Sequence, residues 1–382
     1  MKRLCSSLHT LALFVFIALL LILFLEVILR TVTRDKGKDI HVGNFAYAYH
    51  PWAASRATPG FSTGPMTINK YGWRGKEHDR KKPAGTRRVL LLGDSVAFSS
   101  PELHEEAIIA GYLQAALTES DGQVWEVINM AVPGGTGAKA LATLAHEGIH
   151  FEPDVVVALN GANDLVPLTN IGPNVGIDPF SFVAWDGVHS QMQRLLDPRT
   201  GRGTAADNLT ILVQESALYR YMSKSFSKWL PKRPPQEWPA VINHPEMLQP
   251  FIDGQIAIHY LARGAGAVFI HYVQPYLSLR HRKRLDAADR DALKVHETAF
   301  GATYPAFIDQ GFPILRDKMQ EAAQLHGFKC VDLSLLLIDE EHPFSDTVHT
   351  TYASSTESAP NKKIARAMAD AILSALGLPR AS

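Results

Sequence analysis

The chain has 382 residues, of which 46% are hydrophobic, and its 38 basic residues balance 38 acidic ones. This length and composition exclude a disordered or fibrous chain and allow one large globular domain or two smaller ones. A net charge of zero gives no general attraction to polyanions, so we expect no nucleic-acid partner and only local recognition of any charged substrate.

The first predicted element is an apolar helix near the N-terminus. Residues 11–29, LALFVFIALLLILFLEVIL, are apolar except for Glu26, and a bilayer core of about 30 Å needs roughly 20 such residues. No small-residue cleavage site follows, which favours an uncleaved anchor over a cleaved signal peptide or a buried core helix. We therefore predict an N-terminal anchor at 1–38 with one transmembrane helix at about 8–29.

Residues 39–87 are rich in Gly, Pro, His and aromatic residues without a sustained period. This composition predicts an extended stalk that packs on the main domain. Its best-marked piece is INKYGWRGKE at 68–77, which is interpreted as a tight turn pinned by aromatic residues. The turn belongs either to ordinary surface packing or to the rim of a functional site.

Short apolar runs that end in turns follow the stalk, and helical segments separate them. Such continuous apolar runs fit strands that are buried on both faces of a sheet. Strand, turn and helix in repetition predict an α/β fold in which a mainly parallel sheet has helices on both faces. The runs occupy 89–92, 124–130, 154–164, 267–275 and 328–334, with helices at 250–264, 312–326 and about 362–376.

From 165 to about 250 this regularity fails, and one helix near 214–229 is the only regular element predicted there. We interpret the region as an insertion that forms a cap or a substrate-binding lobe. Its tryptophans, Trp185, Trp229 and Trp238, could stack on sugars or fill the interior of the cap.

Polar motifs follow three of the predicted strands, at the edge where α/β proteins place their sites. Ser95 in GDS stands at a strand-to-helix turn, where its hydroxyl either acts as a nucleophile or caps the helix. Gly134 in VPGGTG could offer an open N–H to an oxyanion or only permit the turn. Asn163 in NGAND could donate to the same oxygen, while Asp164 orients the loop or makes an Asx turn.

A fourth motif, DTVH, lies far downstream and pairs a carboxylate with an imidazole. The spacing of Asp346 and His349 places both on one side of a single turn of chain. Asp346 can then hold the imidazole while its other nitrogen faces Ser95, as in a nucleophile activated by a base.

Together these four motifs resemble the four blocks of the SGNH (GDSL-like) hydrolases, over about residues 88–377. The resemblance implies a flavodoxin-like three-layer α/β/α sandwich and a serine ester hydrolase that needs no cofactor and no metal. It implies an acylated substrate, either a small molecule or a glycan; the predicted tether and compartment, and not the motifs, favour O-acylated envelope glycans over free lipids. The implied roles are Ser95 as nucleophile, His349 as base, Asp346 as its orienter, Ser95, Gly134 and Asn163 as oxyanion hole, and Asp94 and Asp164 as supporting residues.

The chain departs from the family pattern at three places. Ala131 stands where many members have glycine, and Ser99-Ser100 replaces the usual glycine after the start of the nucleophile helix. The segment 350–363 is longer than the usual step to the last helix. We expect the first two changes to alter local turns more than chemistry.

The anchor and the INKYGWRG turn are similar to those of bacterial membrane-tethered members that work outside the cytoplasm. We therefore expect a single-pass protein of the bacterial cytoplasmic membrane with an extracytoplasmic catalytic domain. Basic residues after the apolar run outnumber those before it, so charge counting alone favours the opposite orientation.

Three alternatives remain open at this point. HEGIH at 146–150 matches the zinc metalloprotease motif, although Gly148 weakens the helix and no third ligand follows closely. A catalytically silent domain of the same fold could bind a polymer. An O-acyltransferase of envelope polysaccharide would share the acyl-serine intermediate and differ only in its acceptor.

Overall fold

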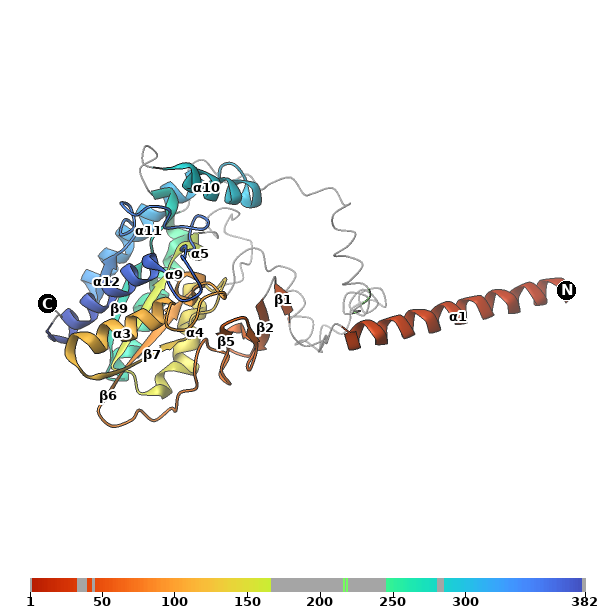
Figure 1. The fold of residues 1–382 in the computed structure, drawn as a ribbon, viewed down its shortest axis with the longest axis horizontal. Coiled ribbons are helices and arrows are strands. Elements are labelled where there is room, and N and C mark those ends of the chain that lie inside the picture. Colours follow the sequence, from red (N-terminus) through yellow and green to blue (C-terminus); the bar gives the residue numbers. More distant parts are fainter. Residues whose placement is uncertain are drawn as a thin grey trace. The chain divides into compact units, whose positions relative to one another are not determined.

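The computed structural model describes residues 2–32, 40–42, 45–165, 216, 218, 245–279 and 285–379 (Figure 1). The chain divides into two units, the first made of Met1–Asp39 with Gln191–Pro234 and the second of Ile40–Ser190 with Pro235–Ser382. Nearly all of the predicted insertion and its three tryptophans lie outside the described residues. The predicted domain bounds at 38, 87 and 377 stay predictions.

The first unit contains the long helix α1 (Lys2–Val32), formed by the apolar run. Its large side chains are exposed, among them Phe14 and Phe24. Glu26, expected to reach water or headgroups, accepts hydrogen bonds from Ser216 Oγ at 2.7 Å and from the Leu218 amide at 3.0 Å. Across the described residues no helix is both long and apolar enough to cross a membrane, so the transmembrane helix predicted at about 8–29 has no support in the structure.

A five-stranded parallel sheet forms the centre of the second unit, in the order β10-β9-β8-β6-β7. The four residues Val89–Leu92 and nearly all of the third strand are fully buried, because both faces of a parallel sheet are covered. The predicted α/β fold with a parallel sheet is thus confirmed. The strands are β6 (Thr86–Gly93), β7 (Val124–Asn129), β8 (Val155–Asn160), β9 (Val268–Val273) and β10 (Lys329–Asp332).

Helices cover both faces of this sheet, which makes three layers (Figure 1). Leu91 and Leu113 belong to the core on one face, and Leu90 and Leu144 to the core on the other. The helices of the first face are α3 (Ile109–Asp121) and α12 (Ala359–Leu376), and those of the second are α4 (Gly137–His146), α9 (Gln249–Gly264) and α11 (Tyr304–His326). The other helices among the described residues of this unit are α2 (Ser95–Phe98), η1 (Gly148–Phe151), α5 (Ala162–Leu165), η4 (Pro245–Leu248), η5 (Leu277–Leu279) and α10 (Ala287–Phe300).

The segment predicted as an extended stalk contains short antiparallel strands. They are β1 (Ile40–Val42), β2 (Phe45–His50) and β3 (Ala54–Ala57), followed by β4 (Ser62–Thr63) and β5 (Met66–Thr67). Lys139 of α4 donates through Nζ to Ser55 Oγ at 2.6 Å, and Tyr47 donates to the carbonyl of Pro133 at 3.2 Å. These contacts hold β2 and β3 against the loop that contains Gly134.

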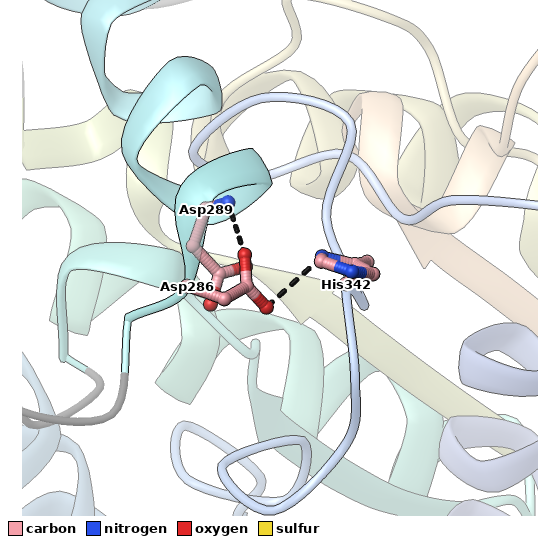
Figure 2. A group of neighbouring side chains, drawn as sticks. All are labelled: Asp286, Asp289 and His342. Carbon is pink, nitrogen blue, oxygen red and sulfur yellow. Dashed lines mark hydrogen bonds and ion pairs between the residues drawn. The ribbon is translucent and has the colours of Figure 1, made fainter.

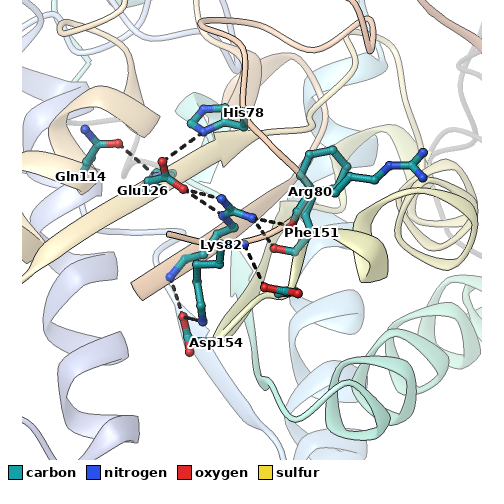
Figure 3. Close-up of polar contacts among 10 residues, drawn as sticks. His78, Arg80, Lys82, Gln114, Glu126, Phe151 and Asp154 are labelled. Carbon is teal, nitrogen blue, oxygen red and sulfur yellow. Dashed lines mark hydrogen bonds and ion pairs between the residues drawn. The ribbon is translucent and has the colours of Figure 1, made fainter. Parts of the chain in front are cut away.

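At the amino end of the sheet a polar network ties the segment before β6 to the strands (Figure 3). Arg88 is fully buried and donates to Glu126 Oε2 at 2.6 Å and to the Phe151 carbonyl at 2.6 Å. Lys82 Nζ donates to Asp154 Oδ2 at 2.6 Å. The network lies at the opposite end of β6 from Ser95.

Candidate active site

The turn at the end of β6 presents Ser95. Asp94, 2% exposed, is the N-cap of α2, and its carboxylate accepts from the Val96 amide at 2.9 Å. The alternative in which Ser95 itself caps the helix is therefore wrong. Within the described part of the chain, neither the Ser95 hydroxyl nor its backbone N–H has a hydrogen-bond partner.

The loop after β7 brings Gly134 to the same edge of the sheet. Its φ of 71° lies in the left-handed region that favours glycine. The next amide, that of Gly135, donates to the Val132 carbonyl at 2.9 Å, whereas the Gly134 N–H has no acceptor among the described residues. Both interpretations of Gly134 fit, because the turn needs glycine and also leaves its N–H available.

Asn163 and Asp164 connect the loop after β8 to the loop after β7. Asn163 Nδ2 donates to the Gly135 carbonyl at 2.7 Å, which leaves the second amide hydrogen for another acceptor. Asp164 accepts from the Gly137 amide at 2.9 Å, at the N-terminus of α4. Since this partner lies 27 residues away, Asp164 is not simply the local Asx turn considered above.

Asp346 fixes the orientation of His349. Its Oδ2 lies 2.6 Å from His349 Nδ1, and its Oδ1 accepts from the Val348 and His349 amides, both at 2.8 Å. The His349 side chain is 40% exposed. Its Nε2 has no partner among the described residues, so the pair has the geometry predicted from the DTVH spacing.

The electrostatics place these groups within range of one another. Burial alone would lower the pKa of His349, but the hydrogen bond and charge of Asp346 and the charge of Asp94 raise it above its usual value. Burial raises the pKa of Asp94 to about 7, against the opposing effect of His349. Burial and the charge of Asp94 raise the pKa of Asp164 to about 8. The Asp346–His349 pair therefore interacts electrostatically with Asp94, the residue that precedes Ser95.

Sequence reasoning missed the residues that support this edge. Thr347, fully buried between Asp346 and His349, accepts from the Leu277 amide at 2.8 Å and donates through Oγ1 to Tyr276 Oη at 3.2 Å. Asn129 donates to the Ala97 carbonyl of α2 at 3.1 Å. A polar residue at the end of a buried strand, as Asn129 is, was the available signal.

The zinc motif at 146–150 does not form in this fold. Helix α4 ends at His146, and Glu147 leaves the helix with φ −129° and ψ −52°. His146 stacks on Trp52 with ring centroids 4.5 Å apart, and Glu147 Oε1 lies 3.0 Å from His50 Nε2. The two histidines of HEGIH thus do not share one helical face, which the metalloprotease geometry requires.

One group of side chains in the described chain could offer three ligand atoms to a metal ion (Figure 2). Asp286, Asp289 and His342 place these atoms within 4.8 Å of one another. Asp286 is the N-cap of α10 and accepts from the Asp289 amide at 2.8 Å, and its Oδ2 lies 2.9 Å from His342 Nδ1. Helix capping and an ion pair already account for this arrangement.

No protein-family model matches the chain, and no curated protein matches it in sequence. Solved structures that resemble it include ester hydrolases. An acetylxylan esterase from Geobacillus stearothermophilus, solved as a catalytic mutant, is 11% identical with a TM-score of 0.39, over 76% of this chain and 94% of that one. A lipase/acylhydrolase from Enterococcus faecalis is 16% identical with a TM-score of 0.38, over 75% and 96%.

Proposed function

We propose that this protein is a serine ester hydrolase that works through an acyl-serine intermediate. The observation that carries the proposal is the Asp346–His349 pair, joined at 2.6 Å and within electrostatic range of the turn that presents Ser95. An imidazole held at Nδ1 by a carboxylate leaves Nε2 to exchange a proton with a nucleophile.

In the first half-reaction, Ser95 Oγ attacks the ester carbonyl while His349 Nε2 accepts its proton. The carbonyl oxygen becomes an oxyanion, for which the N–H groups of Ser95 and Gly134 and the second amide hydrogen of Asn163 are the available donors. The C–O bond to the alcohol then breaks, and the alcohol leaves with the proton from His349.

Water completes the cycle. It gives a proton to His349 and attacks the acyl group, and Ser95 regains its proton from His349 as the acid leaves. The supporting contacts of Asn163 and Asp164 hold the donor loops in place before substrate arrives, which is the condition under which such donors are most effective.

The proposal extends to substrate and location. O-acylated glycans outside the cytoplasmic membrane are the proposed substrates. The exposed apolar side chains of α1, Leu13 to Ile28, support attachment of the protein to a membrane surface. Fractionation of cells that express the chain tests this part, because a chain found only in the soluble fraction contradicts it.

The test of the activity is hydrolysis of p-nitrophenyl acetate and of longer p-nitrophenyl esters by the purified full-length chain. Ser95→Ala should abolish turnover, and EDTA should leave it unchanged, because no step needs a metal. The series of esters also ranks acyl lengths. Turnover that survives Ser95→Ala would overturn the proposal.

A further inference from the structure

The INKYGWRG motif contains Arg74, a buried arginine with no place in the reaction above. Arg74 is 3% exposed, yet every one of its three side-chain nitrogens is hydrogen-bonded. Nε donates to Glu105 Oε1 at 3.2 Å, Nη2 to the Leu103 carbonyl at 2.6 Å, and Nη1 to the carbonyls of Phe98, Ser99 and Ser100 at 3.0, 3.1 and 2.8 Å. One guanidinium thus binds four backbone carbonyls and one carboxylate in residues 98–105, from the end of α2 onward.

That segment needs such a partner. Helix α2 is one turn long, and its last carbonyls have no further turn to bond. Ser99, which ends it, has φ 66° and ψ 169°, a conformation essentially restricted to glycine. Asn129 binds the Ala97 carbonyl and Arg74 binds the Phe98 carbonyl, so side chains from other elements take the place of the missing turn.

The same segment also contacts the part of the polypeptide that carries His349. We call residues 99–107 the nucleophile loop and residues 346–358 the base loop. The His104 amide donates to the Ser355 carbonyl at 2.8 Å, which joins the two loops directly. Asn361, at the start of α12, donates to the Ala107 carbonyl at 3.2 Å and accepts from Thr350 Oγ1, next to His349, at 2.6 Å.

We infer that Arg74 is a positioning residue for catalysis: by capping α2 and folding the nucleophile loop, it sets the position of Ser95 relative to His349. The inference rests on the proposed function. Arg74 touches no reacting atom and acts through the carbonyls of residues 98–103.

Only the fork of a guanidinium suits this role. Lysine has three donors on one nitrogen at the end of a flexible chain, so it cannot bond Glu105, Leu103 and the three carbonyls of residues 98–100 at the same time. The substitution Arg74→Lys therefore keeps the positive charge and removes the simultaneous hydrogen bonds. It separates the effect of these bonds from the effect of the charge.

Arg88 supplies a matched control. It is also buried, and it also donates to one carboxylate, that of Glu126, and to backbone carbonyls, those of Arg80 and Phe151. It lies at the other end of β6, away from Ser95. Arg88→Lys should lower the melting temperature as Arg74→Lys does, so the two variants separate loss of a buried arginine from loss of positioning.

The experiment measures the second-order rate at which a fluorophosphonate labels Ser95 in the full-length chain, beside kcat and KM for p-nitrophenyl acetate. Labelling forms the Oγ–P bond and expels fluoride while His349 takes the proton, so its rate reports on the pair directly. We expect Arg74→Lys to slow labelling and kcat by about 100-fold with KM nearly unchanged, since small misplacements of reacting groups cost this much. Arg88→Lys should label at nearly the wild-type rate, because Arg88 bonds Glu126, Arg80 and Phe151 and makes no hydrogen bond to the nucleophile loop or the base loop.

Equal labelling rates in the two folded variants would overturn the inference while leaving the proposed function intact. Absence of labelling in the wild-type chain would instead refute the proposed function, and the inference with it. If Arg74→Lys does not fold, Glu105→Gln provides the second test, because it removes the ion pair and leaves the carbonyl contacts of Arg74. Wild-type labelling in Glu105→Gln supports carbonyl capping as the means of positioning, and slow labelling in that variant overturns it.

Discussion

Asp346 acts on His349 in two ways that a single substitution separates. Its hydrogen bond to Nδ1 selects the tautomer in which Nε2 can accept a proton, and its charge raises the pKa of the imidazole. Selection of the tautomer increases the rate of hydrolysis at any pH at which the histidine is neutral. The raised pKa narrows the range of pH in which the histidine is neutral.

Asp346→Asn should therefore change the rate and the pH profile in a predictable direction. In the wild type, kcat/KM should fall as pH drops through a His349 pKa that lies above the ordinary value of about 6.5. In the variant this acidic limb should move to lower pH, because the stabilising charge is lost, while the plateau falls by about 10³ to 10⁴ through loss of the tautomer. The measurement is kcat/KM against pH for both forms, and an acidic limb that does not move would contradict the assignment of Asp346.

At the scale of the element, the nucleophile turn depends on close contact between β6 and its neighbours. A Cβ built on Gly93 would stand 2.6 Å from Ala97 Cβ and closer still to the Leu159 carbonyl oxygen. At Gly93 the end of β6 packs so closely against α2 and β8 that a side chain larger than that of glycine does not fit.

Gly93→Ala should destabilise the fold by about 3 kcal/mol or more, because overpacking at a rigid backbone contact leaves no room to relax. Gly254→Ala is the matched change, since nothing lies within 4 Å of its Cβ position in α9. It should stabilise the protein by roughly 0.5 to 1 kcal/mol through helix propensity. Urea unfolding of both variants checks the pair, and equal free energies of unfolding would show that the contact at Gly93 is not tight.

The elements that could be predicted from the sequence are those defined by local pattern. Strands β6, β8 and β9 are almost continuously buried, as their apolar runs predict, and Asp346 and His349 meet because they stand three positions apart in the chain. The predicted helix at 312–326 begins earlier, at Tyr304 in α11, because Pro313 lies inside the helix and does not end it.

Contacts between distant segments were beyond reach of the same reasoning. Nothing local shows that Arg74 will bond carbonyls 24 to 29 residues away, or that Asp164 will cap α4. HEGIH gave a false prediction of a metal site because its local pattern is not kept in the fold. Its spacing is regular in sequence, but Glu147 leaves the helix to pair with His50 from the N-terminal strands.

At the scale of the whole molecule, the edge of the sheet that carries Ser95 combines segments from along the second unit, and two carboxyl groups are buried there. Asp94 is 2% exposed and Asp164 8% exposed. Burial raises the pKa of each, to about 7 and about 8, and the charge of Asp94 adds to the rise at Asp164. The unfolded chain would lose these protons near pH 4.

The sign of the resulting pH dependence follows from linkage. Between about pH 4 and pH 8 the folded protein holds protons that the unfolded chain has released, so these two groups make stability fall as pH rises through that window.

Asp164→Asn keeps an oxygen that can accept from the Gly137 amide and removes one of the two buried charges. The variant should therefore gain melting temperature relative to the wild type as pH rises from 5 to about 8.5, the range in which Asp164 ionises. Glu102→Gln, at an exposed position, is the control and should track the wild type at both pH values. A constant difference between Asp164→Asn and wild type across the range would mean that Asp164 is already ionised in the folded protein at pH 5, and that its hydrogen bonds stabilise the carboxylate more than burial destabilises it.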